Sequence, residues 1–338
     1  MALKIGLIGA GRMGKVYANT LAFSVAEVDL VAIADPDATA INEVAARYKI
    51  PHTYTDYRAL LQSDDVEAVV VASPTGTHAE VIIAAAQAGK NIFSEKPLSQ
   101  SLAACDEALA AVRQAGVKLQ MGFMRRFDAP YAAAKKKILE GVIGTPVMFK
   151  STSRDPFRTS LEFAKRENSG GLIMDMGVHD FDLARWLMNS EVLRVHSEGT
   201  CLAFPELQEV GDIDNVVINL RFASGAIGNI DMSRNAVYGY DIRTEVLGTE
   251  GSLWIGYLQQ TPTLVLTRGG VTHDTVPYFM ERFGAAYAEQ VRVFVHNILV
   301  GSQPEVTGED ARAATAIGIA ATLSFDEDRP VLVSEVDR

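Results

Sequence analysis

The stretch Lys4-Ile-Gly-Leu-Ile-Gly9-Ala-Gly11-Arg-Met-Gly14 decides the fold of the N-terminal part of this chain. Its apolar run, Lys4–Ile8, predicts a strand, and a helical pattern follows over Met13–Ala22. Three glycines in the spacing Gly-x-Gly-x-x-Gly join these two elements. The first glycine permits a tight turn, the second lets the backbone approach a pyrophosphate, and the third lets helix and strand pack closely.

This spacing alone is weak evidence, but here it has a strand before it and a helix after it, as a dinucleotide site requires. The helix N-terminus offers N–H donors and the positive end of a dipole to the phosphates. The turn therefore predicts cofactor contacts from Gly9, Gly11, Arg12, Met13 and Gly14.

An acidic residue follows the second predicted strand, Leu30–Ala34. Asp35 lies about 20 residues after Gly14, where a carboxylate accepts hydrogen bonds from the adenosine ribose diol. Its charge repels the 2′-phosphate of NADP, and Pro36 and Asp37 follow it rather than Arg or Lys. The sequence therefore predicts NAD over NADP. The alternative interpretation makes Asp35 an N-cap of the helix that begins at Ala38.

Strands alternate with helices over the first part of the chain, which predicts βαβ units and a parallel sheet of Rossmann type. The predicted strands are Lys4–Ile8, Leu30–Ala34, Ala68–Ala72, Asn91–Phe93 and Lys118–Met121. The predicted helices between them are Met13–Ala22, Ala38–Tyr48, Tyr57–Leu61, His78–Ala88 and Leu102–Ala115.

The pattern changes after about Met124. Helices are predicted at Ala129–Glu140 and Leu172–Met188, and then strand-like segments follow one another without helices between Leu193 and Thr267. Such a run predicts an α+β domain with a large, mainly antiparallel sheet. We expect a Rossmann NAD-binding domain at residues 1–123 and a substrate-binding and oligomerisation domain at 124–304. A C-terminal helix at about 305–338 is expected to pack back on the first domain.

Composition excludes several classes of function. The 338 residues carry a net charge of −11 without a basic run beyond Lys135–Lys137, which argues against a nucleic-acid surface. No apolar window reaches about 18 residues, so neither a membrane span nor a signal peptide is expected. Two cysteines, Cys105 and Cys201, lie far apart and suit a reducing cytoplasm.

Two further motifs follow predicted parallel strands, at the ends where ligands bind in such sheets. The first is Ser73-Pro74-Thr75-Gly-Thr77-His78, and the second is Glu95-Lys96-Pro97. We expect cofactor contacts from Ser73, Pro74, Thr75, Thr77, His78, Glu95 and Lys96. Thr77 suits a helix cap equally well. Lys96 also suits a hydrogen bond to a substrate oxygen, although a Lys-Pro pair by itself is common.

Asp175 and His179 lie four positions apart on the predicted helix Leu172–Met188, so they share one face. Histidine titrates near neutral pH and suits proton transfer from an alcohol. A structural ion pair is the alternative interpretation of these two residues. A metal site is not expected, because the helix offers one histidine and no His-Glu-x-x-His pattern.

Taken together, these motifs resemble the glucose–fructose oxidoreductase, inositol dehydrogenase and MocA-like family. The resemblance also runs through Ala88-Gly-Lys-Asn-Ile-Phe-Ser-Glu95-Lys96-Pro97, Gly170-Gly-Leu-Ile-Met-Asp175 with His179-Asp180, and Glu245-Val-Leu-Gly-Thr-Glu-Gly251. Within that family, Met121-Gly-Phe-Met-Arg-Arg-Phe-Asp128 and Tyr238-Gly-Tyr240-Asp241 look most like the inositol 2-dehydrogenases.

The resemblance implies NAD-dependent oxidation of a cyclic polyol by a catalytic set of Lys96, Asp175 and His179. Lys96 matches the lysine that contacts the reacting hydroxyl, His179 the acid/base, and Asp175 the carboxylate that orients the substrate. Implied substrate contacts are Met124, Arg125, Ser153, Asp155, Met176, Tyr238 and Tyr240. Ser153, Asp155 and Met176 depart from the inositol dehydrogenase pattern of His, Asn and a small polar residue. Myo-inositol is therefore the default substrate, and another isomer or a pyranose sugar is an alternative.

Two other functions compete with this interpretation. An NADPH-linked sugar or anhydrosugar reductase of the same fold is disfavoured by Asp35. A non-catalytic dinucleotide-binding sensor is disfavoured because both Lys96 and His179 are present. The resemblance also implies that the open face of the second-domain sheet packs against another subunit, and we expect a homo-oligomer, as a tetramer.

Overall fold

A computed structural model describes residues 2–337 and divides the chain into two compact units. The first unit comprises Met1–Phe127 and Ala285–Thr315, and the second comprises Asp128–Gly284 and Ala316–Arg338. Each unit therefore takes one segment from the C-terminal part of the chain. Residues 285–304, expected in the second domain, group with the first unit, and residues 316–338 group with the second.

A six-stranded parallel sheet forms the centre of the first unit, as the strand–helix alternation predicted. Its strand order is β3-β2-β1-β4-β5-β6. The strands are β1 (Leu3–Ile8), β2 (Val28–Ala34), β3 (His52–Tyr54), β4 (Ala68–Val71), β5 (Asn91–Ser94) and β6 (Leu119–Met121). The strand β3 was not predicted, because its three residues, His-Thr-Tyr, are mostly exposed and carry no apolar run.

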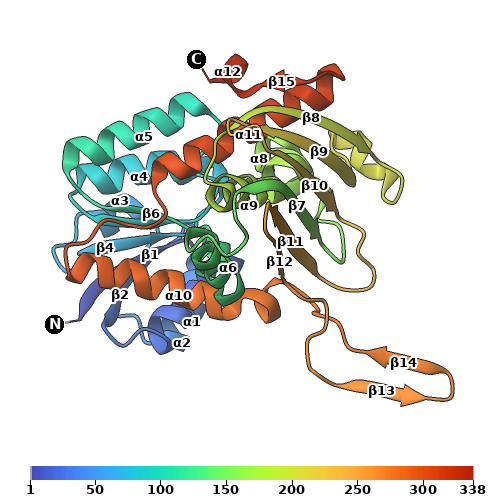
Figure 1. Cartoon of the computed structure of the whole chain (residues 1–338). Helices are drawn as coiled ribbons and strands as arrows, with labels where there is room; N and C mark the ends of the chain where they lie inside the picture. The colour runs from blue at the N-terminus through green and yellow to red at the C-terminus, as the bar shows by residue number, and fades with distance from the viewer. Residues whose placement is uncertain (1, 338) are drawn as a thin grey trace. The chain divides into compact units, whose positions relative to one another are not determined.

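Helices cover both faces of this sheet (Figure 1). One group contains α1 (Arg12–Phe23), α2 (Ala38–Tyr48) and α10 (Phe279–Leu299), and the other contains α3 (Tyr57–Leu61), α4 (His78–Gln87) and α5 (Leu102–Ala115). The four residues of β4 are consequently fully buried. This two-sided burial explains why a central strand such as β4 is a continuous apolar run rather than an alternating one.

The second unit contains a seven-stranded sheet in the order β12-β11-β7-β10-β9-β8-β15. Only β7 and β10 pair in parallel among the described strands of this sheet, so the predicted mainly antiparallel sheet is confirmed. The strands are β7 (Pro146–Arg154), β8 (Val192–Thr200), β9 (Asn215–Phe222), β10 (Ile227–Ser233), β11 (Asp241–Gly248), β12 (Ser252–Ile255) and β15 (Val331–Leu332).

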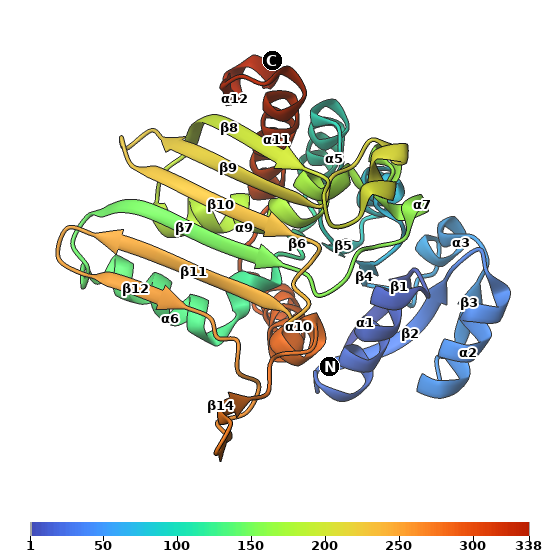
Figure 2. The same ribbon diagram turned by 90° about the vertical axis from the view of Figure 1, so that its right-hand side faces the viewer.

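One face of this sheet carries α9 (Gly171–Met188) and α6 (Ala129–Leu139), and Figure 2 looks onto the opposite face. Burial alternates along the strands in agreement with this arrangement. On β9, Val216, Ile218 and Leu220 are buried while Val217 and Asn219 are exposed. A strand with one buried face needs such a period of two.

Several elements complete the units. The helix α11 (Gly308–Glu327) begins in the first unit, where Arg312 forms an ion pair with Asp106, and its residues from Ala316 onward belong to the second. The short helices α7 (Leu161–Ala164), α8 (Arg166–Ser169) and α12 (Val333–Val336) lie in the second unit. The hairpin β13 (Leu264–Thr267) and β14 (Gly270–His273) projects with all its strand residues exposed (Figure 1). The strand β14 was not predicted, because its Gly-Val-Thr-His sequence lacks an apolar alternation.

A buried ion pair joins two segments of the second unit. Both guanidinium Nη atoms of Arg282 donate to the Asp128 carboxylate over 2.9 Å, and the two side chains are 2% and 9% exposed. Replacing Arg282 by Met is expected to lower the free energy of unfolding by about 3–5 kcal/mol, because Asp128 remains buried without its cation. A denaturant titration measures the change.

The matched control is Lys136→Met, which removes an exposed pair with Glu140 at 3.8 Å. We expect a loss below about 1 kcal/mol there. If both variants lose the same free energy of unfolding, burial of the Arg282–Asp128 pair is not the reason for its larger expected contribution.

Candidate active site

The glycine-rich turn follows β1 at the carboxyl edge of the parallel sheet. Gly9 has a φ of +108°, and a Cβ there would lie 2.5 Å from the Ala72 carbonyl oxygen. A Cβ on Gly14 would lie 2.0 Å from the Gly9 oxygen, so both positions require glycine. At Gly11, by contrast, a Cβ would have no described atom within 4 Å. The backbone is therefore open at the position where a pyrophosphate approaches.

The start of α1 fits an anion. Gly11 occupies its N-cap position, and among the described residues no side chain caps the helix and no acid lies in its first turn. Arg12, exposed, and Met13, half-buried, begin the helix. The N–H groups of this turn and the positive end of the helix dipole therefore suit an anion such as a pyrophosphate.

Asp35 lies directly after β2 and contacts the glycine-rich turn. Its Oδ2 accepts a hydrogen bond from the Ala10 N–H over 2.7 Å, and its Oδ1 accepts one from the Asp37 N–H over 2.9 Å. Asp37, not Asp35, caps α2, accepting from Thr39 N and Ala40 N. Each carboxylate oxygen of Asp35 has a second lone pair that a ribose hydroxyl can use.

The loop after β4 is held by its own polar groups. Ser73 Oγ and Thr77 Oγ1 are hydrogen bonded over 2.8 Å, and Thr77 donates to the Pro74 carbonyl oxygen over 2.8 Å. Thr77 stands at the N-cap of α4, but its side chain makes no capping bond there. Pro74 is exposed, while Ser73 and Thr75 are half-buried. These side chains therefore shape a loop at the carboxyl edge of the sheet.

His78 connects this loop to the one after β5. Its ring is 1% exposed, with Nε2 2.9 Å from the Ser73 carbonyl oxygen and Nδ1 2.7 Å from that of Pro97. Burial lowers the pKa of His78. With both ring nitrogens on backbone oxygens, His78 supports the two loops from inside the unit rather than presenting its ring to a ligand.

Glu95 is likewise buried, and Lys96 beside it is half-buried. Tyr17 donates a hydrogen bond to Glu95 Oε1, and the Lys96 N–H donates to Oε2 over 3.1 Å. Burial raises the pKa of Glu95. The peptide bond between Lys96 and Pro97, whose isomer the sequence leaves open, is cis. The role of Tyr17 was not predicted, because this contact joins α1 to a loop 78 positions away.

In the second unit, α9 carries both Asp175 and His179 one turn apart, as predicted. His179 is 9% exposed, and the Asp175 side chain is 21% exposed. The next residue, Asp180, is fully buried and accepts a hydrogen bond of 2.5 Å from Ser151 Oγ on β7. That bond and the packing of α9 on β7 and β10 hold the helix on the sheet.

Arg234 and Asp212 complete the surroundings of Asp175. Arg234 is 1% exposed, and its Nη2 lies 3.5 Å from Asp175 Oδ2 and 3.7 Å from Asp212 Oδ2. Asp212 Oδ1 accepts a hydrogen bond of 2.8 Å from the Leu172 N–H, and burial raises its pKa. Sequence analysis missed both residues, because neither lies in a motif and the fold alone brings them to α9.

The residues expected to contact substrate are distributed over both units. Met124 and Arg125 are buried on the 3-10 helix Met124–Phe127 of the first unit. Ser153 is fully buried on the face of β7 that also carries Ser151, and Met176 is buried on α9. Asp155 is half-buried, and its backbone N–H donates to the Ser233 carbonyl oxygen over 2.8 Å.

The two tyrosines differ in their surroundings. Tyr238 is 41% exposed, donates to Asp241 Oδ2 over 2.8 Å and accepts from Arg154 Nη1 over 3.1 Å. Tyr240 is buried with its ring against Tyr278 and Phe283. Tyr238 therefore belongs to a charged network that includes the outward side of β7, whereas Tyr240 packs in the apolar interior.

Residues 2–337 contain neither a metal-binding cluster nor a membrane-spanning helix. In this range no group of three or more His, Cys, Asp or Glu side chains is arranged to hold a metal ion. No helix of the same range is long and apolar enough to cross a membrane.

Two family descriptions match this chain. The oxidoreductase family with an NAD-binding Rossmann fold matches residues 3–123, and the GFO/IDH/MocA C-terminal domain matches residues 131–254. The myo-inositol 2-dehydrogenase of Thermotoga maritima is 40% identical over 99% of each chain. The scyllo-inositol 2-dehydrogenase (NAD(+)) of Bacillus subtilis is 39% identical over 97% of this chain and 96% of its own.

A solved structure agrees with these matches. The scyllo-inositol dehydrogenase of Lactobacillus casei, with bound cofactor NAD(H) and scyllo-inositol, superposes with a TM-score of 0.95. The match has 31% sequence identity and covers 99% of this chain and 100% of the other.

Proposed function

Because the chain belongs to the GFO/IDH/MocA oxidoreductase family, with its NAD-binding Rossmann fold, we propose that it oxidises a ring hydroxyl of an inositol to the ketone, the inosose. The observation that carries the proposal is the Asp175–His179 pair on α9, in a chain that matches two inositol dehydrogenases over nearly its full length. The default substrate is myo-inositol.

In the proposed reaction, NAD supplies the nicotinamide ring that accepts a hydride from the carbinol carbon. His179 accepts the hydroxyl proton as the carbon–oxygen double bond forms. Lys96 donates a hydrogen bond to the same oxygen and stabilises the negative charge that develops there. Asp175 orients the substrate. One secondary alcohol and NAD thus give one ketone, NADH and a proton that leaves through His179.

We assign cofactor binding to the carboxyl edge of the parallel sheet. The backbone of the turn from Gly9 to Gly14 suits the pyrophosphate, and Asp35 suits the ribose diol. The residues proposed to line or support this site are Gly9, Gly11, Arg12, Met13, Gly14, Asp35, Ser73, Pro74, Thr75, Thr77, His78, Glu95 and Lys96. His78 and Glu95 act through the loops that they hold, since both side chains are buried.

Substrate binding is assigned to Met124, Arg125, Ser153, Asp155, Met176, Tyr238 and Tyr240. A polyol in a closed site needs a partner for each hydroxyl, because unpaired polar groups are costly there. Ser153, Asp155 and Met176 therefore decide which isomer is preferred. The buried ring of Tyr240 favours a packing contact, and the hydrogen-bonded hydroxyl of Tyr238 favours a polar one.

The proposal is tested by mixing the protein with NAD and a panel of inositol isomers, aldopyranoses and anhydrosugars, and by following the absorbance of NADH. The same panel is tested with NADP in parallel. A rate with NAD on one inositol is expected. Activity on pyranoses alone would retain the mechanism and change the substrate class. A rate with NADPH on a keto sugar would favour a reductase, and binding of NAD without any turnover would favour a sensor.

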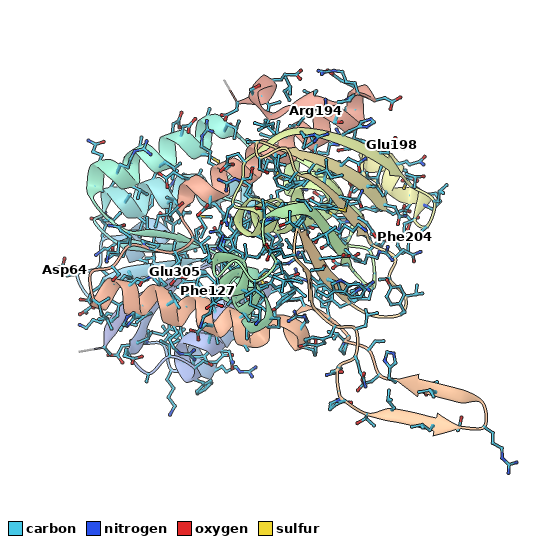
Figure 3. The ribbon with its side chains drawn as sticks, in the orientation of Figure 1. Asp64, Phe127, Arg194, Glu198, Phe204 and Glu305 are labelled. Atoms are coloured by element: carbon cyan, nitrogen blue, oxygen red, sulfur yellow. The ribbon has the colours of Figure 1, made fainter. Side chains whose placement is uncertain are left out.

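The outward face of the second-unit sheet suits contact with further copies of the chain. Val217, Ile227, Leu247 and Trp254 are exposed there, at 44%, 42%, 38% and 84%. Arg194 and Glu198, labelled in Figure 3, are exposed charges on β8 of the same sheet. We expect a homotetramer, because burial against another chain would remove these exposed apolar side chains from water.

Light scattering coupled to gel filtration measures the mass of the particle. Trp254→Lys is expected to dissociate it, because a charge replaces an exposed ring on that face. The matched control is Phe23→Lys, which replaces a ring that is 74% exposed in the first unit. A monomeric wild-type protein would contradict the prediction.

We also propose a cytoplasmic location, supported by two buried free thiols, Cys105 and Cys201.

A further inference from the structure

The fully buried guanidinium of Arg234 is unusual, because arginine almost never lies inside a protein without compensation. The side chain follows the end of β10 and is 2% exposed. A guanidinium keeps its charge in proteins, so burying it is costly unless anions surround it. Asp175 and Asp212 are the carboxylates that lie within 4 Å of it in the described residues.

Asp212 links this guanidinium to the beginning of α9. Its Oδ1 accepts the Leu172 N–H, and its Oδ2 faces Arg234 Nη2 at 3.7 Å. Gly171 has a φ of +74°, and a Cβ there would lie 2.8 Å from Asp212 Oδ1. The carboxylate thus packs closely against the first turn of the helix that carries Asp175 and His179, and holds it relative to Arg234.

Asp175 faces the same Nη2 atom of Arg234 as Asp212 does. Its Oδ2 lies 3.5 Å from Nη2, and its side chain is 21% exposed, whereas Asp212 is 3% exposed. The attraction acts in a dry environment, where it is stronger than at a surface. It therefore favours a position of the Asp175 carboxylate beside Arg234.

We propose that Arg234 is a positioning residue that holds Asp175 as a fixed carboxylate one turn from His179, with Asp212 as the second counterion that anchors Arg234 to the start of α9. This inference rests on the proposed function, since it assigns Arg234 a role in the reaction through Asp175. Arg234 acts on the substrate only through Asp175.

Arg234→Met is expected to lower kcat for the preferred inositol by about a hundredfold, the effect of a misplaced active-site group. The KM for NAD should change by less than about threefold, because the substitution leaves the residues proposed to bind the cofactor in place. Arg234→Lys should recover part of kcat, since an ammonium retains the charge. Arg185→Met is the control. Arg185 lies in the last turn of the same helix, and the substitution removes its ion pair of 2.6 Å with Glu191. Its kcat should match the wild type.

A double-mutant cycle with Asp175→Asn tests the coupling directly. Arg234→Met should cause no further fall of kcat in the Asp175→Asn background. Losses that multiply, or a full kcat in Arg234→Met, would overturn the proposal. So would equal kcat values for Arg234→Lys and Arg234→Met.

The same cycle on free energies of unfolding needs no substrate. The double variant should be more stable than the two single losses predict, because the buried cation and its carboxylate are removed together. If the wild type oxidises no inositol, the proposed function fails, while this measurement still decides whether Arg234 and Asp175 are coupled. Additive losses of stability would overturn the pairing of Arg234 with Asp175.

Discussion

His179→Ala is expected to lower kcat for inositol oxidation by about a hundred- to ten-thousand-fold, because the hydroxyl loses the base that accepts its proton. The affinity for NAD should stay the same, since the glycine-rich turn and Asp35 belong to the first unit and His179 to the second. Single-turnover kinetics measure the chemical step, and a titration of NAD measures binding. Added imidazole should restore part of the rate by acting as the missing base.

The matched control for this variant is His273→Ala. His273 is exposed on the hairpin strand β14, with its Nδ1 near the Asp274 carbonyl oxygen. It should leave kcat unchanged. A wild-type rate in His179→Ala would remove His179 from the mechanism. A loss of NAD affinity as large as the loss of kcat would instead indicate that the substitution disturbs the fold.

Asp35→Ala combined with Pro36→Arg is expected to reverse the preference from NAD to NADP. Hydrogen bonds to a charged group contribute about 1.5–3 kcal/mol, so losing the ribose contact should weaken NAD binding by about ten- to a hundredfold. Removing the carboxylate also ends its repulsion of a 2′-phosphate, and the new guanidinium can bind that phosphate through two donors. The ratio of kcat/KM for the two cofactors measures the change.

Asp37→Ala controls for loss of the neighbouring acid. Asp37 caps α2 through the N–H groups of Thr39 and Ala40, so this variant should lose about 1 kcal/mol of stability and keep its preference for NAD. Asp35→Ala alone also removes the hydrogen bond to the Ala10 N–H. If the NAD/NADP ratio of the double variant equals that of the wild type, the assigned contact between Asp35 and the ribose is wrong.

Local patterns were sufficient for most of the fold. The strand before Gly9 and the helix that contains Gly14 followed from apolar periodicity, and Gly14 is required by its approach to the Gly9 carbonyl oxygen within the same turn. Asp175 and His179 share a helix face because four positions span about one turn of α-helix. The mainly antiparallel sheet followed from successive strand patterns without helices between them.

Contacts between distant segments could not be predicted in this way. The interpretation of Asp35 as a helix cap was wrong because Asp37 performs that role, and two acids so close in sequence both fit the pattern. The link from His78 to Pro97 and the one from Tyr17 to Glu95 join separate elements of the first unit. The hairpin strand β14 and the edge strand β15 are too short to produce a periodic signal.

The sequence by itself determined the glycine-rich turn between β1 and α1, the acid that follows β2, and the helix that carries Asp175 and His179. These features depend on residues within one turn, strand or helix, where spacing dictates geometry. Only the tertiary structure placed Arg234 and Asp212 beside Asp175, and His78 between two loops. The physical reason is that packing and burial select these partners from far along the chain, and no local period records which buried charge meets which carboxylate.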